Sequence, residues 1–131
     1  MSASKRAPTG VAGLELEALE EVWRHGEAGA TVRTVLEAIN ARDEKQRAYT
    51  TLMTVLGRLH EKGLLERQRA GSADVYRATV TRERYMAARA QAEIEQLVDT
   101  YGDVALAGFV RRVSAEDPRR RARLRRLARG D

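Results

Sequence analysis

The chain has 131 residues, a formal net charge of +5 and no cysteine. Its length suits one compact domain, or a small domain with an appended helical segment. Without cysteine there is no disulfide framework, thiolate metal site or cysteine nucleophile. The basic balance favours an anionic partner, with nucleic acid ahead of an acidic membrane.

No signal peptide and no stretch of about 18 consecutive apolar residues is found in the sequence. We therefore expect a soluble, cytoplasmic protein without a membrane partner. Residues 1–13 combine Ser, Lys, Arg, Pro and Gly with little periodicity, which predicts a flexible arm.

Two amphipathic helices are predicted next. The first runs from about Leu14 to His25 and ends at Gly26. The second begins after Thr31, a hydroxyl suited to N-capping, and ends within residues 40–43. Each carries apolar residues at intervals of three and four, so both predict a face buried in a shared core.

A third helix is predicted between Ala48 and Gly63, with two different faces. Its apolar face carries Leu52, Val55, Leu56 and Leu59. Its polar face carries Arg47, Thr50, Thr51, Thr54 and Arg58. Threonine offers a hydroxyl and a methyl to base edges, and arginine reaches guanine or phosphate with two parallel hydrogen bonds. This face is a candidate DNA reader, although the pattern alone also fits a solvated surface.

A β-hairpin is predicted after the third helix, with a strand from Leu64 to Arg69, a turn over residues 70–74 and a return strand from Val75 to Thr79. Its candidate phosphate contacts are Arg67, Arg69 and Arg77. Three helices followed by a hairpin predict a mainly α fold, a winged helix-turn-helix with a small β-hairpin wing, over residues 14–80. In that arrangement the third helix enters the major groove and the wing lies against the backbone.

A helical dimerisation region is predicted over residues 81–114. Helix-forming composition runs from Thr81 to Gly102, and a further helix from about Asp103 to Val113. These helices have enough apolar residues to pack but too few for a core of their own, so we expect a second copy as their partner. The expected interface residues are Tyr85, Ile94, Leu97, Tyr101, Leu106, Phe109 and Val110.

The last segment, residues 115–131, is rich in arginine. Ser114 and Asp117 frame a predicted capping box, with Pro118 at the first position of a final helix. The arginines suit contact with phosphate or another anionic surface, and a solvated, frayed end is the alternative interpretation.

The motif AYTTLMTVLGRLHEKGLLER, residues 48–67, resembles the recognition-helix signature of the penicillinase and methicillin-resistance repressor family, the BlaI/MecI/CopY group of bacterial regulators. LELEALEEVW, residues 14–23, is similar to the opening of its first helix, and the likeness continues to about residue 113. The resemblance implies a homodimer that binds an inverted-repeat operator in double-stranded DNA and represses transcription, in some members in response to β-lactams.

The resemblance also implies roles for single residues. Thr50, Thr51, Thr54 and Arg58 fall on the family's base- and phosphate-contacting helix, and Tyr49 takes the aromatic position at its start. The three wing arginines fall in the family's backbone-contacting hairpin.

Release from DNA differs between branches of that family. Some members are cut before a phenylalanine in the dimerisation region through a membrane sensor and protease. The matching bond here is Gly108–Phe109, where those members carry asparagine instead of Gly108. Another branch senses copper through paired cysteines, which this chain lacks. The resemblance thus implies a sensor-linked protease as a partner and no cofactor or metal.

The sequence gives little support for an enzymatic function. His25 and His60 have no cysteine or paired histidine at metal-ligand spacing, and no glycine-rich phosphate loop or nucleophile motif occurs. The carboxylates Glu15, Glu17, Glu20 and Glu21 are better explained as a solvated helix face than as paired acid–base catalysts. The alternatives to a repressor are a winged-helix protein–protein adaptor and a non-specific architectural DNA binder.

Overall fold

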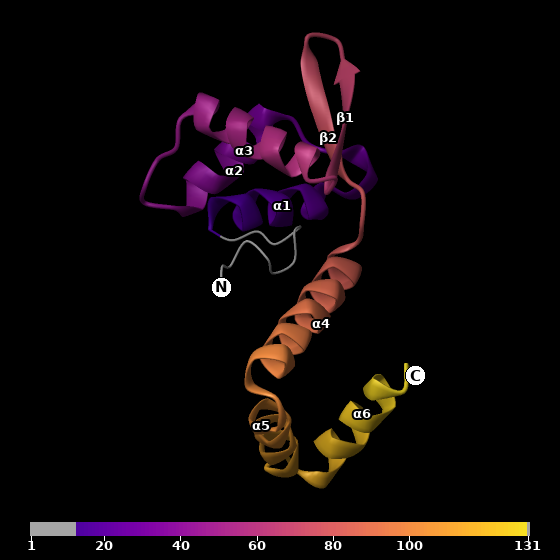
Figure 1. Ribbon diagram of the computed structural model, residues 1–131. Helices are drawn as coiled ribbons and strands as arrows, with labels where there is room; N and C mark the ends of the chain where they lie inside the picture. Colours follow the sequence, from indigo (N-terminus) through magenta and orange to yellow (C-terminus); the bar gives the residue numbers. More distant parts are fainter. Residues whose placement is uncertain (1–12, 131) are drawn as a thin grey trace. The chain divides into compact units, whose positions relative to one another are not determined.

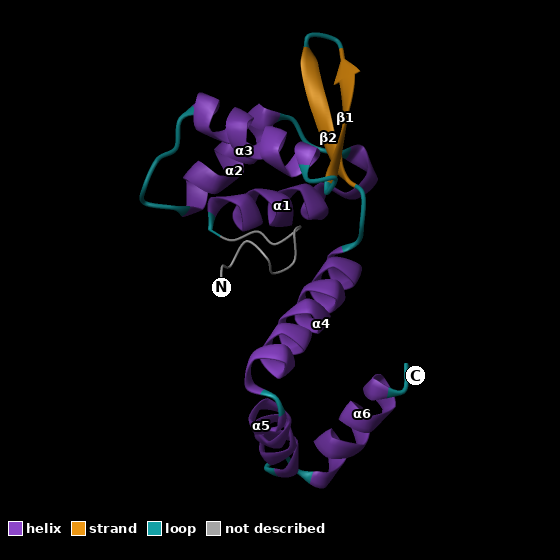
Figure 2. Cartoon of the chain, in the orientation of Figure 1, coloured by secondary structure: helices purple, strands orange, loops and turns teal. Residues whose placement is uncertain are grey.

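The computed structural model describes residues 13–130, which form helices joined by short loops and one two-stranded hairpin (Figures 1 and 2). The predicted arm lies outside the described residues except for Gly13. The chain divides into two compact units, Met1–Ala90 and Gln91–Asp131. The first unit confirms the predicted winged helix, with three helices followed by the hairpin wing.

The first unit begins with helices α1 (Leu14–His25), α2 (Val32–Arg42) and α3 (Tyr49–Glu61), and the short 3-10 helix η2 (Gly26–Ala28) follows α1. Thr31 caps α2 as predicted, because its hydroxyl accepts a hydrogen bond of 3.1 Å from the backbone N–H of Thr34. Gly26 ends α1 with a φ of 56°, a conformation that favours glycine.

The core of this unit is formed by the facing sides of the three helices together with the hairpin. The predicted apolar face of α3 is confirmed as buried. Each fully buried side chain removes apolar surface from water and contributes about 1.5–3 kcal/mol. The largest fully buried side chains are Leu19, Val22, Val35, Ile39, Leu52, Leu56, Leu59 and Leu65.

The hairpin pairs strand β1 (Leu65–Ala70) with β2 (Ala73–Ala78) in antiparallel register. The predicted five-residue turn is wrong: Ala70 pairs with Ala73, so only Gly71 and Ser72 form the loop. Two-residue hairpin loops require a positive φ at their first position, and Gly71 has a φ of 64°. The short loop adds Ala70, Ala73 and Asp74 to the strands, whereas Leu64 and Thr79, the outer ends of the predicted strands, lie outside them.

A segment between η2 and α2 fastens the wing to the helices. Ala30 and Tyr76 exchange two backbone hydrogen bonds, of 2.9 and 2.8 Å, in an isolated antiparallel bridge. Next to it, Gly29 has a φ of 76°, and a Cβ built there would lie 2.9 Å from the Tyr76 carbonyl oxygen. The close approach of the two backbones therefore requires glycine at this position.

The acidic face of α1 is not simply solvated, which corrects that expectation. Glu21 is buried at 6% exposure, and its Oε1 lies 2.6 Å from Arg24 and 3.2 Å from Arg42. Glu15 pairs with Lys62 of the α3 C-cap at 2.7 Å. These carboxylates join α1 to α2 and α3 by ion pairs, because the same helix face packs against both neighbours.

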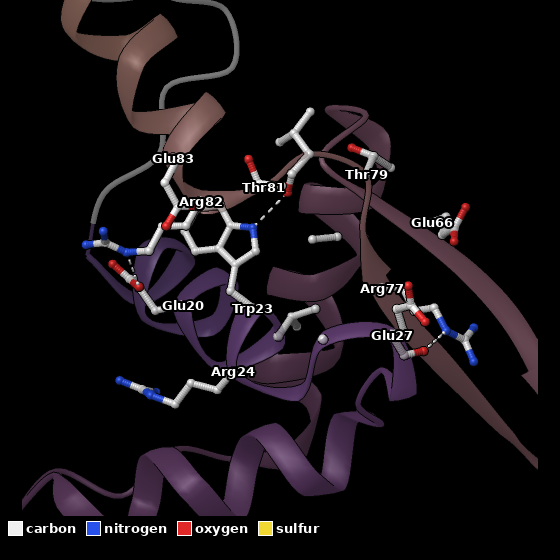
Figure 3. Close-up of a pocket in the computed structure, with 14 residues that line it drawn as sticks. Glu20, Trp23, Arg24, Glu27, Glu66, Arg77, Thr79, Thr81, Arg82 and Glu83 are labelled. Carbon is white, nitrogen blue, oxygen red and sulfur yellow. Dashed lines mark hydrogen bonds and ion pairs between the residues drawn. The ribbon is translucent and has the colours of Figure 1, made fainter. Parts of the chain in front are cut away.

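The start of helix α4 (Arg82–Tyr101) belongs to the first unit. The indole Nε1 of Trp23 donates a 2.9 Å hydrogen bond to the Val80 carbonyl, and Arg82 reaches Glu20 at 2.8 Å (Figure 3). The Trp23 and Tyr85 rings pack with centroids 5.6 Å apart. Trp23 is therefore a packing residue that also orients the chain as it enters α4.

The second unit contains the rest of α4, helix α5 (Asp103–Ser114) and helix α6 (Pro118–Ala128). The predicted capping box is wrong, because Ser114 is the last residue of α5 and Asp117 itself caps α6. Pro118 disfavours helical geometry in the residue before it, and Asp117 accordingly has extended backbone. No residue of α5 or α6 is buried within the described chain.

Candidate nucleic-acid interface

Helix α3 presents its predicted polar face to solvent. Thr50, Thr51, Thr54 and Arg58 are all exposed, and their side chains recur at intervals of three and four residues. Because Leu52 and Leu59 bury the opposite side, the helix cannot rotate about its axis without exposing core. The core thus determines which side chains face a ligand.

The start of α3 is held by the loop that precedes it. The Asn40 side-chain amide brackets Arg47: it accepts a 2.8 Å hydrogen bond from the Arg47 N–H and donates one of 3.1 Å to its carbonyl. Gln46 donates to the carbonyls of Asn40 and Asp43 at 2.9 and 3.0 Å. Arg47 is half-buried. This network fixes where α3 begins and thus the register of its exposed face.

Tyr49, at the first position of α3, is exposed and carries a cation against its ring. The guanidinium carbon of Arg33 lies 5.6 Å from the ring centroid, a cation–π distance. The sequence reasoning did not select Arg33. Its position in the first turn after the Thr31 cap is a signal that could have found it, because helix starts favour anions such as phosphate.

The strand register separates the three wing arginines. Arg67 lies opposite Tyr76 and Arg69 opposite Asp74, so both occupy one face of the hairpin. Arg77 lies opposite Glu66 and therefore on the other face. There its Nε donates a 2.6 Å hydrogen bond to the Glu27 carbonyl. The structure thus groups two of the three predicted arginines and gives the third a role in holding η2.

The two grouped arginines are both cationic and exposed. A hydrogen bond to the Tyr76 side chain raises the pKa of Arg67 above its ordinary value, so this guanidinium stays charged. Arg69 lies 3.5 Å from Asp74 and donates to the Gly71 carbonyl at 3.3 Å. Exposed contacts of this kind contribute little to stability, which leaves both side chains available to a phosphate.

A hollow of about 480 Å³ separates the wing from the starts of α2 and α3. Arg33 of α2, Arg69 of β1, and Tyr49 and Met53 of α3 contribute to its lining. Met53 is half-exposed on α3 and was not selected from the sequence, because methionine at helical spacing normally indicates core. Its two arginines outnumber its one carboxylate, Asp74, so this hollow suits an anionic backbone.

A second hollow, of about 740 Å³, lies where β2 leads into α4 (Figure 3). Trp23 and Val80 form part of its lining, and the charged groups around it have both signs. Arg82 donates to the Glu20 carboxylate, and Arg77 donates to the Glu27 backbone carbonyl. Because the lining carries four carboxylates against three arginines, this hollow does not form part of the candidate interface.

The predicted dimerisation residues separate into two groups. Tyr85 is buried against Trp23 in the first unit, so it lies in the core and is not accessible to a second copy. Phe109 is half-buried. Ile94, Leu97, Tyr101, Leu106 and Val110 are exposed large apolar side chains, and the structure adds Val104 and Val113.

The candidate cleavage bond, Gly108–Phe109, lies inside α5, and both residues are half-buried. A helical peptide bond has its carbonyl and N–H groups engaged in the helix. A protease would have to unwind α5 locally before it could cut there.

Comparison with known proteins places these features in a family. A model of the penicillinase repressor family matches residues 11–128. The chain belongs to this family. The transcriptional regulator BlaI of Mycobacterium tuberculosis, from strains H37Rv and CDC 1551, is 37% identical over 110 residues, which cover 83% of this chain and 78% of that protein.

One solved structure is also similar to this chain. It is the solution structure of Bacillus licheniformis BlaI in its monomeric form, in complex with the blaP half-operator. That chain has 23% identity and a TM-score of 0.46, with 56% of this chain and 85% of that chain covered.

Membership of the penicillinase repressor family identifies the chain as a transcriptional repressor and not an enzyme, since the family consists of regulators. Within residues 13–130, no cluster of three or more histidine or acidic side chains is arranged to hold a metal ion. None of the helices over those residues is both long and apolar enough to span a membrane.

Proposed function

We propose that this repressor binds an inverted-repeat operator in double-stranded DNA as a homodimer, with α3 in the major groove of each half-site. The observation that carries the proposal is the exposed Thr50, Thr51, Thr54 and Arg58 face, held outward by a buried apolar face. Hydroxyl, methyl and guanidinium groups at helical spacing match the donor and acceptor pattern of base edges. Arg67 and Arg69 supply phosphate contacts from the wing.

The homodimer is supported by the second unit. Its apolar side chains recur along α4 and α5, yet none of them is buried by the residues that the structure describes: Val104 is 72% exposed and Val110 is 63% exposed. Apolar patches of this kind mark interaction surfaces. A two-fold interface between copies would bury them and place two α3 helices on one operator.

The test is a fluorescence-anisotropy titration of the protein against its own upstream region, with random-sequence DNA as the competitor. Specific binding by roughly a thousandfold or more over random DNA is expected at near-physiological salt. Thr54→Ala and Arg58→Ala should each reduce that ratio by roughly 5- to 100-fold, because each removes about 1–3 kcal/mol of base discrimination.

Arg84→Ala is the matched control. Arg84 is exposed in the first turn of α4 and lies outside the α3 face, so its replacement removes the same charge without touching the proposed reader. Equal loss of preference in Arg84→Ala and Arg58→Ala would contradict direct readout by α3. Equal binding of wild type to both DNAs would instead indicate an architectural or adaptor protein.

For release of the repressor, we propose a β-lactam-linked cut at Gly108–Phe109. The cut would divide α5, the helix that carries Leu106 on one side of the bond and Val110 on the other. Each half would lose part of the apolar surface, and two separate monomers would then have to assemble on the operator. Mass spectrometry showing only intact chain in β-lactam-treated, derepressed cells would contradict this route.

A further inference from the structure

The positive charge of this chain is concentrated at one end. Residues 118–131 contain seven of the 24 basic residues and one of the 19 acidic residues, a formal net charge of +6. The other 117 residues together carry −1. Residues 14–80, the winged helix, have a formal net charge of −1. The last helix, α6, with the residues after it therefore supplies all of the chain's net basicity.

Within the described chain, the arginines of α6 differ in their contacts. Arg120 lies 3.6 Å from Glu116, and Arg121 donates to the carbonyls of Glu116 and Ser114, so both are tied to the turn before the helix. The side chains that make no hydrogen bond or ion pair to any described residue are Arg119, Arg123, Arg125 and Arg126. All four are exposed.

The geometry of α6 places these charges together. Arg119, Arg123 and Arg126 stand at intervals of four and three residues, hence on one face. They span roughly 10 Å along the helix axis, the length over which one strand of duplex DNA carries about three phosphates. Like charges at such spacing destabilise an isolated helix. A polyanion would relieve that repulsion.

Helix α6 is too weakly apolar for a membrane partner. Its apolar residues after Pro118 are Ala122, Leu124, Leu127 and Ala128, and none of them is aromatic. Helices that lie on membranes bury a broad face containing Trp, Phe or Leu. Charge density without such a face favours nucleic acid over a lipid surface.

We propose that α6 is a second DNA-contacting element, which binds phosphates of the duplex flanking the operator without reading its sequence. This inference rests on the proposed function, because it assumes that α3 holds the protein at a specific site. In this arrangement α3 supplies selectivity and α6 supplies affinity that depends on salt. Neutralising α6 should therefore weaken operator and random DNA by the same factor.

The test compares full-length wild type with the variant carrying Arg119→Gln, Arg123→Gln, Arg125→Gln and Arg126→Gln. Binding is measured from about 50 to about 200 mM salt, on an operator duplex with long flanks and on random DNA. The three arginines on one face account for three phosphate contacts, so their loss lowers the log–log salt slope by about 2.7. The affinity that wild type gains when salt is lowered across this range should therefore shrink by roughly fortyfold in the variant. The ratio of operator to random affinity should not change.

Two further variants keep the result interpretable. Lysine at the same four positions retains the charge and should preserve most of the slope. The double variant Arg119→Gln with Arg123→Gln removes two of the three contacts and should lower the slope by about two thirds as much, even if the quadruple variant were to lose its helix.

Each outcome decides a different point. A wild-type slope in the quadruple variant, with operator preference intact, would overturn the role of α6 and leave the proposed function standing. Binding of anionic phospholipid vesicles that requires the four arginines, with an unchanged DNA slope, would overturn it in favour of a membrane partner. Wild type without operator preference would instead remove the proposed function itself.

Discussion

At the scale of single residues, Glu21 shows how a charge can belong to the core. Its carboxylate lies within 2.6 Å of Arg24, 3.2 Å of Arg42 and 3.3 Å of His25. Burial alone would raise the pKa of Glu21, but hydrogen bonds and charge from Arg42 and Arg24 outweigh it and hold the pKa below its ordinary value of 4.5. The carboxylate therefore stabilises the folded state only while it is ionised.

This arrangement predicts a pH-dependent stability. The unfolded chain takes up the proton near the ordinary pKa of 4.5, whereas the folded chain takes it up at a lower pH. The contribution of Glu21 is therefore fully present above about pH 4.5 and is lost as the pH falls through the folded pKa. Glu21→Gln should cost about 1–3 kcal/mol at neutral pH, and the gap to wild type should narrow on acidification.

Urea unfolding followed by circular dichroism between about pH 7 and about pH 3 measures this gap. Glu44→Gln, in the exposed loop after α2, removes a carboxylate outside the core and should leave stability within about 0.5 kcal/mol of wild type. A stability difference between Glu21→Gln and wild type that stays constant over the whole pH range would show that the charge of Glu21 does not contribute to stability.

At the scale of elements, the wing is positioned by the segment just before α2. The Ala30–Tyr76 bridge joins that segment to β2, and Arg77 adds a hydrogen bond to the Glu27 carbonyl. The same bridge brings the wing beside the start of α2, where Arg33 and Arg69 line one hollow. The placement of Arg69 relative to α3 therefore depends on residues that contact no ligand.

Gly29→Ala should destabilise the protein by roughly 2 kcal/mol or more and loosen the wing. A Cβ at this position would lie 2.6 Å from Val75 Cγ1 and 2.9 Å from the Tyr76 oxygen, at a φ of 76° that alanine rarely adopts. Thermal unfolding measures the loss, and amide hydrogen exchange in β2 should report the loosening.

Gly57→Ala is the matched control for that substitution. Gly57 lies inside α3, and an added Cβ there would meet no atom within 4 Å apart from its chain neighbours and the backbone of its own helix. Because alanine is the better helix former, this variant should gain up to about 1 kcal/mol. An equal loss of stability in both variants would contradict a specific role for Gly29.

At the scale of the whole molecule, the exposed apolar side chains and the net positive charge both lie outside the main core. The first unit buries its apolar faces within itself. Residues of α5 stay exposed, and the net positive charge is confined to α6 and the residues after it. The two features fit two different partners: a second copy would cover the apolar surface, and a polyanion would neutralise the charge.

Val110→Asp should split the dimer by placing an unpaired charge in the proposed interface. Analytical ultracentrifugation should find wild type at twice the 14.6 kDa mass of the chain and the variant near that mass. Ser72→Asp in the hairpin loop adds the same charge outside the interface and should remain dimeric. A variant of Val110 with unchanged mass would exclude this residue from the interface.

The helices and the two faces of α3 could be predicted from the chain alone, because helical periodicity is a local property. Leu52, Val55, Leu56 and Leu59 recur at a spacing that leaves one buried side. The bounds of α1 follow in the same way from its apolar stripe and from Gly26. The wing can be predicted for a similar reason. The predicted turn is too long because Ala70 and Ala73 carry no turn or strand signal of their own.

Other features depend on which segments meet in space, and no local pattern reports them. Tyr85 continues an apolar stripe of α4, yet it packs on Trp23, 62 residues earlier in the chain. Arg77 follows the other wing arginines in sequence but lies on the opposite face, because strand register alternates side chains. Helical periodicity thus determines the exposed face of α3, whereas long-range pairing decides which side chains accompany it, since each pairing depends on partners far away in the chain.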